Sequence, residues 1–121
     1  MQRKPITDPE TVRSLIEGHR HWYHQMELAP GIVTPGAHPS GKVLKQLDAL
    51  GLPCEASGMR VLDVGCSDGF FSFEMERRGA EVVGIDYADP DATGFSTAAR
   101  ILDSRVTHRV RNVYNLTPEE D

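Results

Sequence analysis

One short stretch in the middle of the chain constrains its fold more than any other. Residues 61–70 read VLDVGCSDGF: an apolar run, an acid, a loop with two glycines, and then an aromatic residue. A second apolar run, EVVGID at residues 81–86, follows after the length of one short helix. Strand, loop, helix and strand in this order predict two parallel strands joined by a right-handed crossover. The fold class is therefore predicted to be α/β.

The remaining sequence extends this alternation on both sides. Asp8 and Pro9 predict a capped helix that ends at Gly18. Residues 19–39 are predicted to be irregular, with one short strand near residues 32–33, before a helix capped by Ser40. That helix has four predicted core residues, namely Val43, Leu44, Leu47 and Leu50. The elements predicted after it are a strand at 60–64, a helix from Ser67 or Asp68 to Gly79, a strand at 81–86, a helix around 95–102 and a strand at 106–110.

Composition narrows the class of protein. A chain of 121 residues holds one domain at most, and its formal net charge of −5 disfavours binding to nucleic acid through bulk charge. Two cysteines in unlike contexts form no disulfide framework, which predicts a reduced, cytoplasmic protein. No apolar run is long enough to span a bilayer, so no membrane contact is expected.

The glycine loop after the first strand of the pair is a general device for binding a cofactor. Glycines let a ligand approach the backbone, and the helix that follows offers free N–H groups. A dinucleotide loop requires G-x-G-x-x-G, but counting from Gly65 the later glycine positions hold Ser67 and Phe70. A P-loop requires a lysine that this loop lacks. Both kinds of phosphate site are therefore disfavoured.

The charges of the loop distinguish an anionic ligand from a cationic one. The loop contains Asp63 and Asp68 and no cation, so a pyrophosphate would be repelled while an ammonium and a sulfonium would be attracted. S-adenosylmethionine carries both of these cations. Asp86, at the end of the second strand of the pair, suits the two ribose hydroxyls, although it would suit a dinucleotide equally well.

The motifs VLDVGCSDGFFS and VVGID resemble the first two motifs of class I S-adenosylmethionine-dependent methyltransferases. The upstream HWYHQMELAPGIVTPG and the later RNVYNLTPE are similar to segments of a narrower group, the wobble-uridine tRNA methyltransferase-like proteins. The resemblance covers about residues 19–119. It implies a Rossmann-like parallel sheet of which this chain supplies about three strands with N-terminal helices.

The resemblance also implies roles for individual residues. Asp63 and Gly65, with Cys66 and Ser67 between the glycines, would bind the methionine end of S-adenosylmethionine, and Gly69 would let the helix pack closely. Cys66 itself reads as a small packed residue and not as a nucleophile.

Three further positions complete the expected cofactor site. Asp86 would bind the ribose and Tyr87 would cover the adenine. Asn112 would reach the adenine amine, in place of the commoner aspartate.

The aromatic segment before the first strand of the pair is expected to act as a lid. Trp22, Tyr23 and His24 would cover the cofactor and the substrate, and Tyr23 and His24 are the candidates for a general base. Methyl transfer needs mainly positioning and desolvation, so a base is not required by the chemistry alone. The spacing of the histidines matches no zinc pattern, and no metal site is predicted.

By the same resemblance, the full fold has seven strands. We therefore divide the chain into an N-terminal helical and lid segment, residues 1–55, and the first half of the cofactor-binding domain, residues 56–121, truncated before the fourth strand. The first strand of the pair would then have an unpaired edge. Three explanations are open: a portion of a longer protein, which we favour, pairing with a second copy or a partner chain, or a remnant that does not catalyse.

The sequence thus predicts a methyltransferase that transfers the methyl group of S-adenosylmethionine to a small molecule or a tRNA, leaving S-adenosylhomocysteine. This chain alone is expected to be incomplete and inactive. The alternative is a non-catalytic fragment that binds S-adenosylmethionine or a nucleotide and works by assembling with a partner chain.

Overall fold

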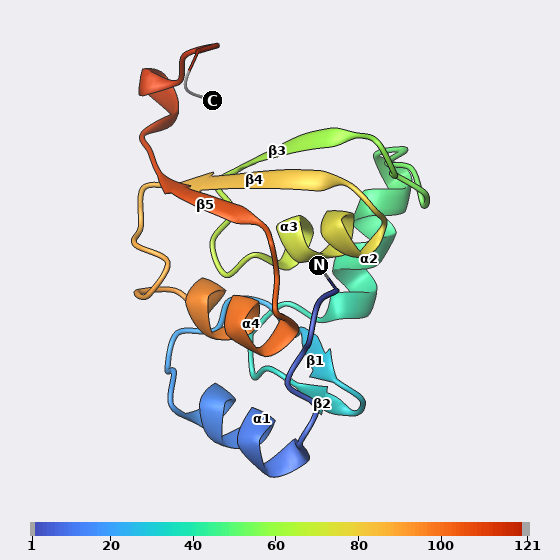
Figure 1. Ribbon diagram of the computed structural model, residues 1–121, viewed down its shortest axis with the longest axis vertical. Helices are drawn as coiled ribbons and strands as arrows, with labels where there is room; N and C mark the ends of the chain where they lie inside the picture. The colour runs from blue at the N-terminus through green and yellow to red at the C-terminus, as the bar shows by residue number, and fades with distance from the viewer. Residues whose placement is uncertain (1, 120–121) are drawn as a thin grey trace.

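A three-stranded parallel sheet with helices against one face forms the frame of the molecule (Figure 1). The computed structural model describes residues 2–119. The sheet contains β3 (Arg60–Val64), β4 (Glu81–Asp86) and β5 (Thr107–Val110), in the order β3-β4-β5. This confirms the predicted α/β class and parallel pairing, and it places β3 at an edge that no other described strand covers.

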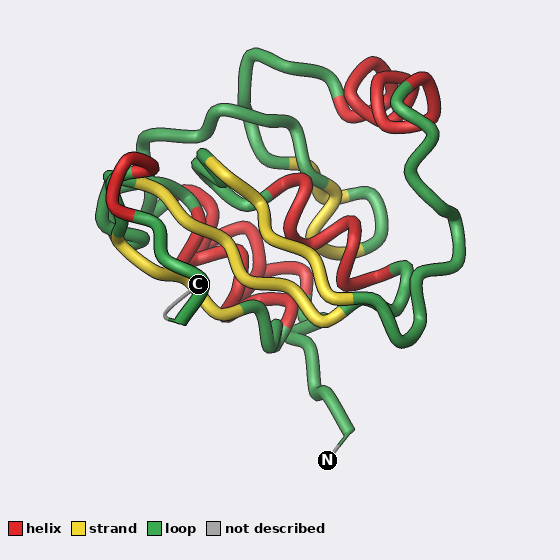
Figure 2. The backbone as a smooth tube through the Cα atoms, turned by 90° about the horizontal axis from the view of Figure 1, so that it is seen from above, coloured by secondary structure: helices red, strands yellow, loops and turns green. Residues whose placement is uncertain are grey.

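The two crossover helices lie on the same side of the sheet. They are α3 (Phe70–Arg77), between β3 and β4, and α4 (Phe95–Leu102), between β4 and β5. Figure 2 looks onto the sheet with these helices behind it. On the other face Leu62 is 41% exposed and Val64 is 51% exposed, so this face keeps apolar side chains in contact with solvent. An incomplete Rossmann-like fold accounts for both the open edge and the open face.

The N-terminal third packs against the crossover helices, with α1 and the hairpin below α4 and α2 beside α3 in Figure 1. It contains α1 (Pro9–Glu17), a hairpin of β1 (Glu27–Ala29) and β2 (Ile32–Val33), and α2 (Ser40–Ala49). Asp8 caps α1 as predicted, because its carboxylate accepts a hydrogen bond from Thr11 N at 3.0 Å. The strand β1 was not predicted, because three residues with the burial pattern exposed-buried-buried give no alternation to recognise.

Three details of the predicted helices are wrong. Pro39, not Ser40, occupies the N-cap of α2, and Leu50 is 74% exposed because the chain leaves the helix before Leu50 can turn inward. The helix after β3 begins at Phe70 and not at Ser67 or Asp68. Ser67 has φ 50° and Gly69 has φ 91°, and these left-handed conformations delay the start of the helix.

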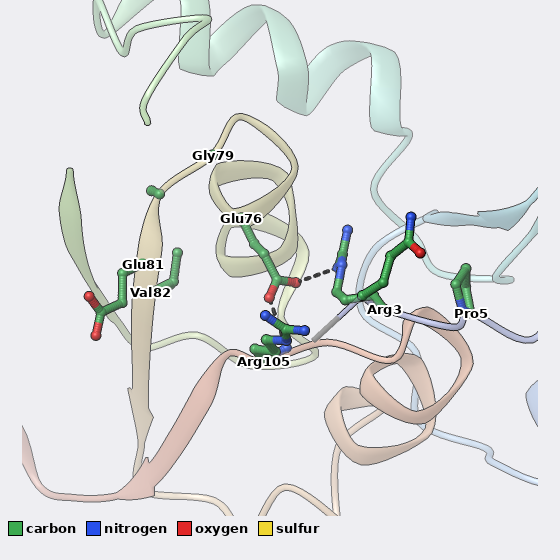
Figure 3. Close-up of a pocket in the computed structure, with 9 residues that line it drawn as sticks. Arg3, Pro5, Glu76, Gly79, Glu81, Val82 and Arg105 are labelled. Carbon is green, nitrogen blue, oxygen red and sulfur yellow. Dashed lines mark hydrogen bonds and ion pairs between the residues drawn. The ribbon is translucent and has the colours of Figure 1, made fainter. Parts of the chain in front are cut away.

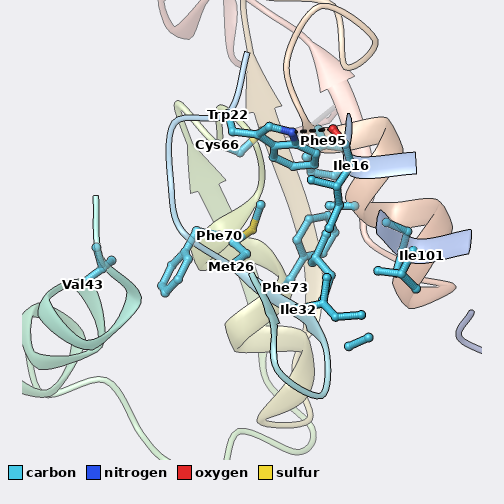
Figure 4. Packing of buried hydrophobic residues seen from close by; sticks show 14 residues of the cluster. Ile16, Trp22, Met26, Ile32, Val43, Cys66, Phe70, Phe73, Phe95 and Ile101 are labelled. Atoms are coloured by element: carbon cyan, nitrogen blue, oxygen red, sulfur yellow. Dashed lines mark hydrogen bonds between the residues drawn. The ribbon is translucent and has the colours of Figure 1, made fainter. Parts of the chain in front are cut away.

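The larger of two apolar clusters joins the N-terminal third to the two crossover helices (Figure 4). Trp22 is 8% exposed, and its indole N–H donates to the Ile16 carbonyl at 3.1 Å. Met26 and Ile32 of the hairpin region lie in the same cluster as Phe73 of α3. The predicted lid role for Trp22 is therefore wrong, since its ring is part of this core.

The contact between Trp22 and Gly94, at the start of α4, provides a test of this packing. A Cβ at Gly94 would lie 2.3 Å from two indole carbons of Trp22. We predict that Gly94→Ala lowers the free energy of unfolding by about 1–3 kcal/mol, the usual cost of overpacking, measured by urea denaturation. Gly41→Ala is the control, because a Cβ there meets nothing within 4 Å. Equal stability of the two variants would contradict the packing described.

Candidate functional site

The residues predicted to bind a cofactor, apart from Asn112 after β5, lie around the carboxyl ends of β3 and β4. Ligands of open parallel sheets bind at this edge. The loop that leaves β3 is held against β4, because the N–H groups of Gly65 and Cys66 both donate to the Ile85 carbonyl, at 2.8 and 2.9 Å. Gly65 has φ 75°, and a Cβ there would meet no atom within 4 Å. The backbone at Gly65 is thus open to a ligand from this side.

Gly69 has the opposite surroundings. Its φ is 91°, and a Cβ would lie 2.5 Å from the Phe73 ring and 2.8 Å from the Phe95 ring. The two rings are 5.0 Å apart, so the glycine allows the loop to approach the joint between α3 and α4. This close approach is the role that the resemblance implied for Gly69.

Asp86 organises the loop from the end of β4. One carboxylate oxygen accepts the Ser67 N–H at 2.9 Å and the other accepts the Ala88 N–H at 2.9 Å. The side chain is buried, with 9% of the residue exposed. Each carboxylate oxygen has two lone pairs, so each can accept one more hydrogen bond, as from a pair of ribose hydroxyls.

Asp63 lies on the helix-covered face of β3. Its carboxylate accepts the Ser72 hydroxyl at 2.7 Å. Burial raises the pKa of the Asp63 carboxyl, and the nearby Asp86 raises it further, while Ser72 and the neighbouring His24 act in the opposite direction. The charged form is therefore disfavoured in the folded protein, and a bound cation near Asp63 would restore it.

Asp68 is the loop residue that the sequence placed incorrectly. It has no exposed surface, and its carboxylate is engaged by the N-terminal segment. Its Oδ2 accepts the backbone N–H groups of Tyr23 and His24 at 2.9 and 2.8 Å, and its Oδ1 lies 2.6 Å from His24 Nδ1. Burial raises the pKa of this carboxyl, but the hydrogen bonds from His24 and Tyr23 outweigh burial and hold the pKa below its ordinary value.

The two candidate bases differ in exposure. His24 is 6% exposed and packs against the Phe70 ring at 5.0 Å. Tyr23 is 53% exposed, and its ring lies 4.3 Å from that of His38. The structure brings both residues to the loop after β3, since Asp68 binds the backbone of both.

The predicted adenine-binding residues lie on the surface. Tyr87 is 87% exposed, directly after β4. Asn112 is exposed too, and its side chain caps the 3₁₀ helix η1 (Val113–Asn115) by accepting the Tyr114 N–H at 3.0 Å. Neither side chain contacts the loop of residues 65–69 through a hydrogen bond of the described structure, so their binding roles stay predictions.

Cys66 is packed tightly under the sheet. Burial raises the pKa of its thiol to about 12, and Asp63 and Asp86 add to this effect. A Cβ at Gly84 would lie 3.0 Å from the Cys66 sulfur. The thiol therefore stays protonated and fills space, as the sequence predicted.

Two residues that support the loop were missed from sequence. Thr93 donates through its hydroxyl to the Ser67 carbonyl at 3.1 Å, and it accepts the Phe95 N–H at 3.2 Å. Ser72 supports Asp63 from α3. A Thr two residues before a helix is a recognisable capping signal. Its contact with a loop 26 residues away has no signal in the sequence.

A separate cavity of about 620 Å³ lies at the other end of the sheet, where β4 and β5 begin (Figure 3). It is lined by residues at the starts of β4 and β5 and by the N-terminal segment. Glu76 in its wall accepts hydrogen bonds from the Arg3 side chain and from the Arg105 N–H. Parallel sheets bind cofactors at the carboxyl ends of their strands, so we do not assign this cavity to the cofactor. No cluster of metal-ligating side chains occurs within residues 2–119, and no helix there is long and apolar enough to cross a bilayer.

Comparison with known proteins addresses the identity of this site. Residues 55–91, which contain β3, the loop, α3 and β4, match the family model described as "Methyltransferase domain". The chain is related to methyltransferases. This agrees with the coarser part of the resemblance seen in the sequence.

The individual relatives compared are also named as methyltransferases. The chain is 36% identical over 83 residues to a ubiquinone biosynthesis O-methyltransferase of Azoarcus sp. (strain BH72), covering 68% of this chain and 32% of the relative. It is 39% identical over 125 positions to the mitochondrial ubiquinone biosynthesis O-methyltransferase of Bos taurus, covering 88% of this chain and 30% of the relative. The chain thus spans about a third of the length of these relatives.

The opposite pKa directions of Asp63 and Asp68 predict opposite effects of neutralising them. At pH 7 we expect Asp63→Asn to raise the melting temperature, because it removes a buried charge while keeping an acceptor for Ser72. We expect Asp68→Asn to lower stability by about 2 kcal/mol, the scale of a hydrogen bond to a charged group. Calorimetry of both variants measures the difference.

The pH dependence follows from the same signs. The pKa of Asp68 in the folded protein lies below its value in the unfolded chain, which is about 3.9. The stability that ionised Asp68 contributes is therefore complete above about pH 3.9 and is lost as the pH falls through the folded pKa. The pKa of Asp63 in the folded protein lies above its value in the unfolded chain. Ionisation of Asp63 therefore destabilises the fold as the pH rises from the unfolded pKa through the folded pKa. The melting temperature of Asp68→Asn should therefore fall less on acidification than that of the wild type. Parallel pH curves would contradict the assignment.

Proposed function

We propose that this chain contributes the cofactor-binding half of an S-adenosylmethionine-dependent methyltransferase whose acceptor is a hydroxyl group of a small molecule. The observation that carries the proposal is the arrangement at the carboxyl ends of β3 and β4, where the carboxylates of Asp63 and Asp86 are neighbours and the backbone at Gly65 is open. The match of residues 55–91 to a methyltransferase domain supports it.

The residues present suit this cofactor in their chemistry. The carboxyl ends of β3 and β4 offer two carboxylates with free acceptor capacity, Asp63 and Asp86, and residues 61–70 contain no cation. The space beside Gly65 is free of protein atoms within 4 Å of a Cβ position. Asp86 would hold the ribose hydroxyls and Asp63 the ammonium end. S-adenosylmethionine, when bound, supplies a methyl group on a sulfonium.

The protein contributes electrostatic attraction and a preorganised loop to the proposed mechanism. Burial of Asp63 and Asp86 strengthens their attraction for a cation, since water screens it less there. The loop is fixed before a ligand arrives, because Asp86 holds Ser67 and the Ile85 carbonyl holds Gly65 and Cys66. Such preorganisation lowers the entropic cost of placing the methyl group in line with an acceptor. Tyr87 and Asn112 remain the proposed contacts to adenine.

The nature of the acceptor is inferred from the relatives. Those compared are named O-methyltransferases of ubiquinone biosynthesis, which favours a hydroxyl of a small molecule. The net charge of −5 agrees with this, since a tRNA would be repelled. The tRNA acceptor suggested by the narrower resemblance, and the non-catalytic module, are the alternative outcomes of the test below.

Titration calorimetry with S-adenosylhomocysteine tests the cofactor assignment. We expect the wild-type chain to bind it, and NAD to bind far more weakly. Asp86→Asn should weaken binding by about 10- to 100-fold, because the ribose hydroxyls lose an ionised acceptor worth roughly 1.5–3 kcal/mol. Asp89→Asn is the matched control, because this exposed carboxylate lies in the next loop and its Oδ1 accepts only the Asp91 N–H.

The outcomes separate the alternatives. Tighter binding of NAD, or equal affinities of the Asp86→Asn and wild-type chains, would refute the cofactor site. Methyl transfer by the complete native protein to catechol, and not to bulk tRNA, would support the proposed acceptor class. Transfer to tRNA would favour the narrower resemblance, and binding without any transfer would favour the non-catalytic module.

A further inference from the structure

A buried carboxylate and an imidazole form a pair beside the proposed cofactor site. Asp68 Oδ1 lies 2.6 Å from His24 Nδ1, and the two side chains are 0% and 7% exposed. We propose that His24 is the general base that removes the proton from the acceptor hydroxyl, and that Asp68 is the residue that positions it. This inference rests on the proposed methyltransferase function.

The carboxylate of Asp68 is fixed in orientation by contacts other than its contact with the imidazole. Its Oδ2 accepts the N–H groups of Tyr23 and His24, and these two bonds prevent rotation of the carboxylate. Oδ1 is therefore directed at His24 Nδ1 by the backbone. A carboxylate oxygen can only accept when ionised, so Nδ1 must carry the proton.

The position of the proton determines what the imidazole can do. In a neutral ring with Nδ1 protonated, Nε2 has a free lone pair and can accept a proton from another molecule. The carboxylate also stabilises the imidazolium that forms once that proton is taken. An orienting carboxylate next to a histidine is the arrangement expected of a general base.

The pair lies close to the groups that would hold the methyl donor. Asp68 belongs to the same loop as Gly65, and the charge of His24 acts on the buried carboxyl of Asp63. The rings of Phe70 and Phe71 pack against the imidazole at 5.0 and 5.8 Å between centroids. These rings exclude water from the imidazole on the side of α3.

The titratable groups around His24 come from three parts of the fold. Asp68 from the loop and Asp63 from β3 both stabilise a positive imidazole. The rings of Tyr23 and His38 lie 4.8 and 5.9 Å from it, from the N-terminal segment. Two carboxylates, one tyrosine and one further histidine are therefore the titratable neighbours of the imidazole among the described residues.

The reaction step balances without any other reactant. The acceptor O–H bond breaks and its proton goes to His24 Nε2. The acceptor oxygen forms a bond to the methyl carbon while the carbon–sulfur bond breaks, and that electron pair remains on sulfur. The proton on His24 is then lost to solvent, which restores the base.

Asparagine at position 24 is the sharpest variant, because its amide can still donate to Asp68 but has nothing in the place of Nε2. We expect His24→Asn to bind S-adenosylhomocysteine within about twofold of wild type and to lose roughly 10²-fold or more in kcat/KM, the usual contribution of a general base. The assay is methyl transfer to catechol by the complete native protein. Its pH profile should lose the acidic limb that the wild type shows. His21→Asn, an exposed histidine of the same segment, is the control and should keep both rate and profile.

Nitrogen NMR of the imidazole gives a second readout that does not depend on turnover. In the 121-residue chain we expect neutral His24 to carry its proton on Nδ1. In Asp68→Asn, whose amide can donate to Nδ1, the proton should move to Nε2, and the transfer rate should fall with it. If Asp68 had only a structural role, Asp68→Asn would lower stability, but the transfer rate would not change together with the position of the proton on His24.

The inference and the proposed function fail in different ways. Absence of S-adenosylhomocysteine binding by the folded wild type would refute the proposed function, and the inference with it. Normal binding with a His24→Asn rate within threefold of wild type would overturn the inference alone. A proton on Nε2 in the wild type, or an imidazole still doubly protonated where transfer is fastest, would overturn it too.

Discussion

Asp68 accepts two backbone N–H groups and one imidazole nitrogen from residues 23 and 24, and the arrangement of the site depends on these three contacts. They join the loop after β3 to a segment 44 residues earlier in the chain. Because Asp68 has no exposed surface, each of these hydrogen bonds is shielded from water and strengthened by the low local dielectric. The loop can therefore keep one conformation although three of its residues are glycine or serine.

The same interaction changes which charges are available to a ligand. The sequence suggested that Asp63 and Asp68 would both attract a cationic cofactor. In the structure both oxygens of Asp68 already accept hydrogen bonds from Tyr23 and His24, and these bonds hold the pKa of its carboxyl low. Asp63 and Asp86 are the carboxylates that remain beside Gly65 with unused acceptor capacity. The argument for a cationic ligand thus rests on a different pair of acids from the one that suggested it.

Much of the frame could be predicted because its signals are local. The Asp8–Pro9 start of α1, the apolar runs of β3 and β4 and the helical spacing of α4 each lie within a few residues. The parallel pairing of β3 with β4 followed from the alternation of strand, helix and strand. An uncovered β3 edge and open apolar positions at Leu62 and Val64 agree with a chain that spans a third of its relatives.

The parts that could not be predicted depend on contacts between distant residues. Nothing near Asp68 in sequence indicates that it would face Tyr23 and His24, so it was read as a helix start. Trp22 was expected over the cofactor, but the absence of a side chain at Gly94 lets its ring enter the core. Asp86 ends a strand, as its place in the sequence predicted, while its hydrogen bonds to Ser67 and Ala88 depend on the folded loop.

The central claim is that the carboxyl ends of β3 and β4 hold S-adenosylmethionine. A crystal structure of the chain soaked with S-adenosylhomocysteine tests it most directly. The account predicts the ribose hydroxyls within hydrogen-bond distance of the Asp86 carboxylate, with the amino-acid end against Gly65 and Asp63. A ligand found in the cavity beside Glu76 and Arg105, with the loop after β3 free, would contradict it.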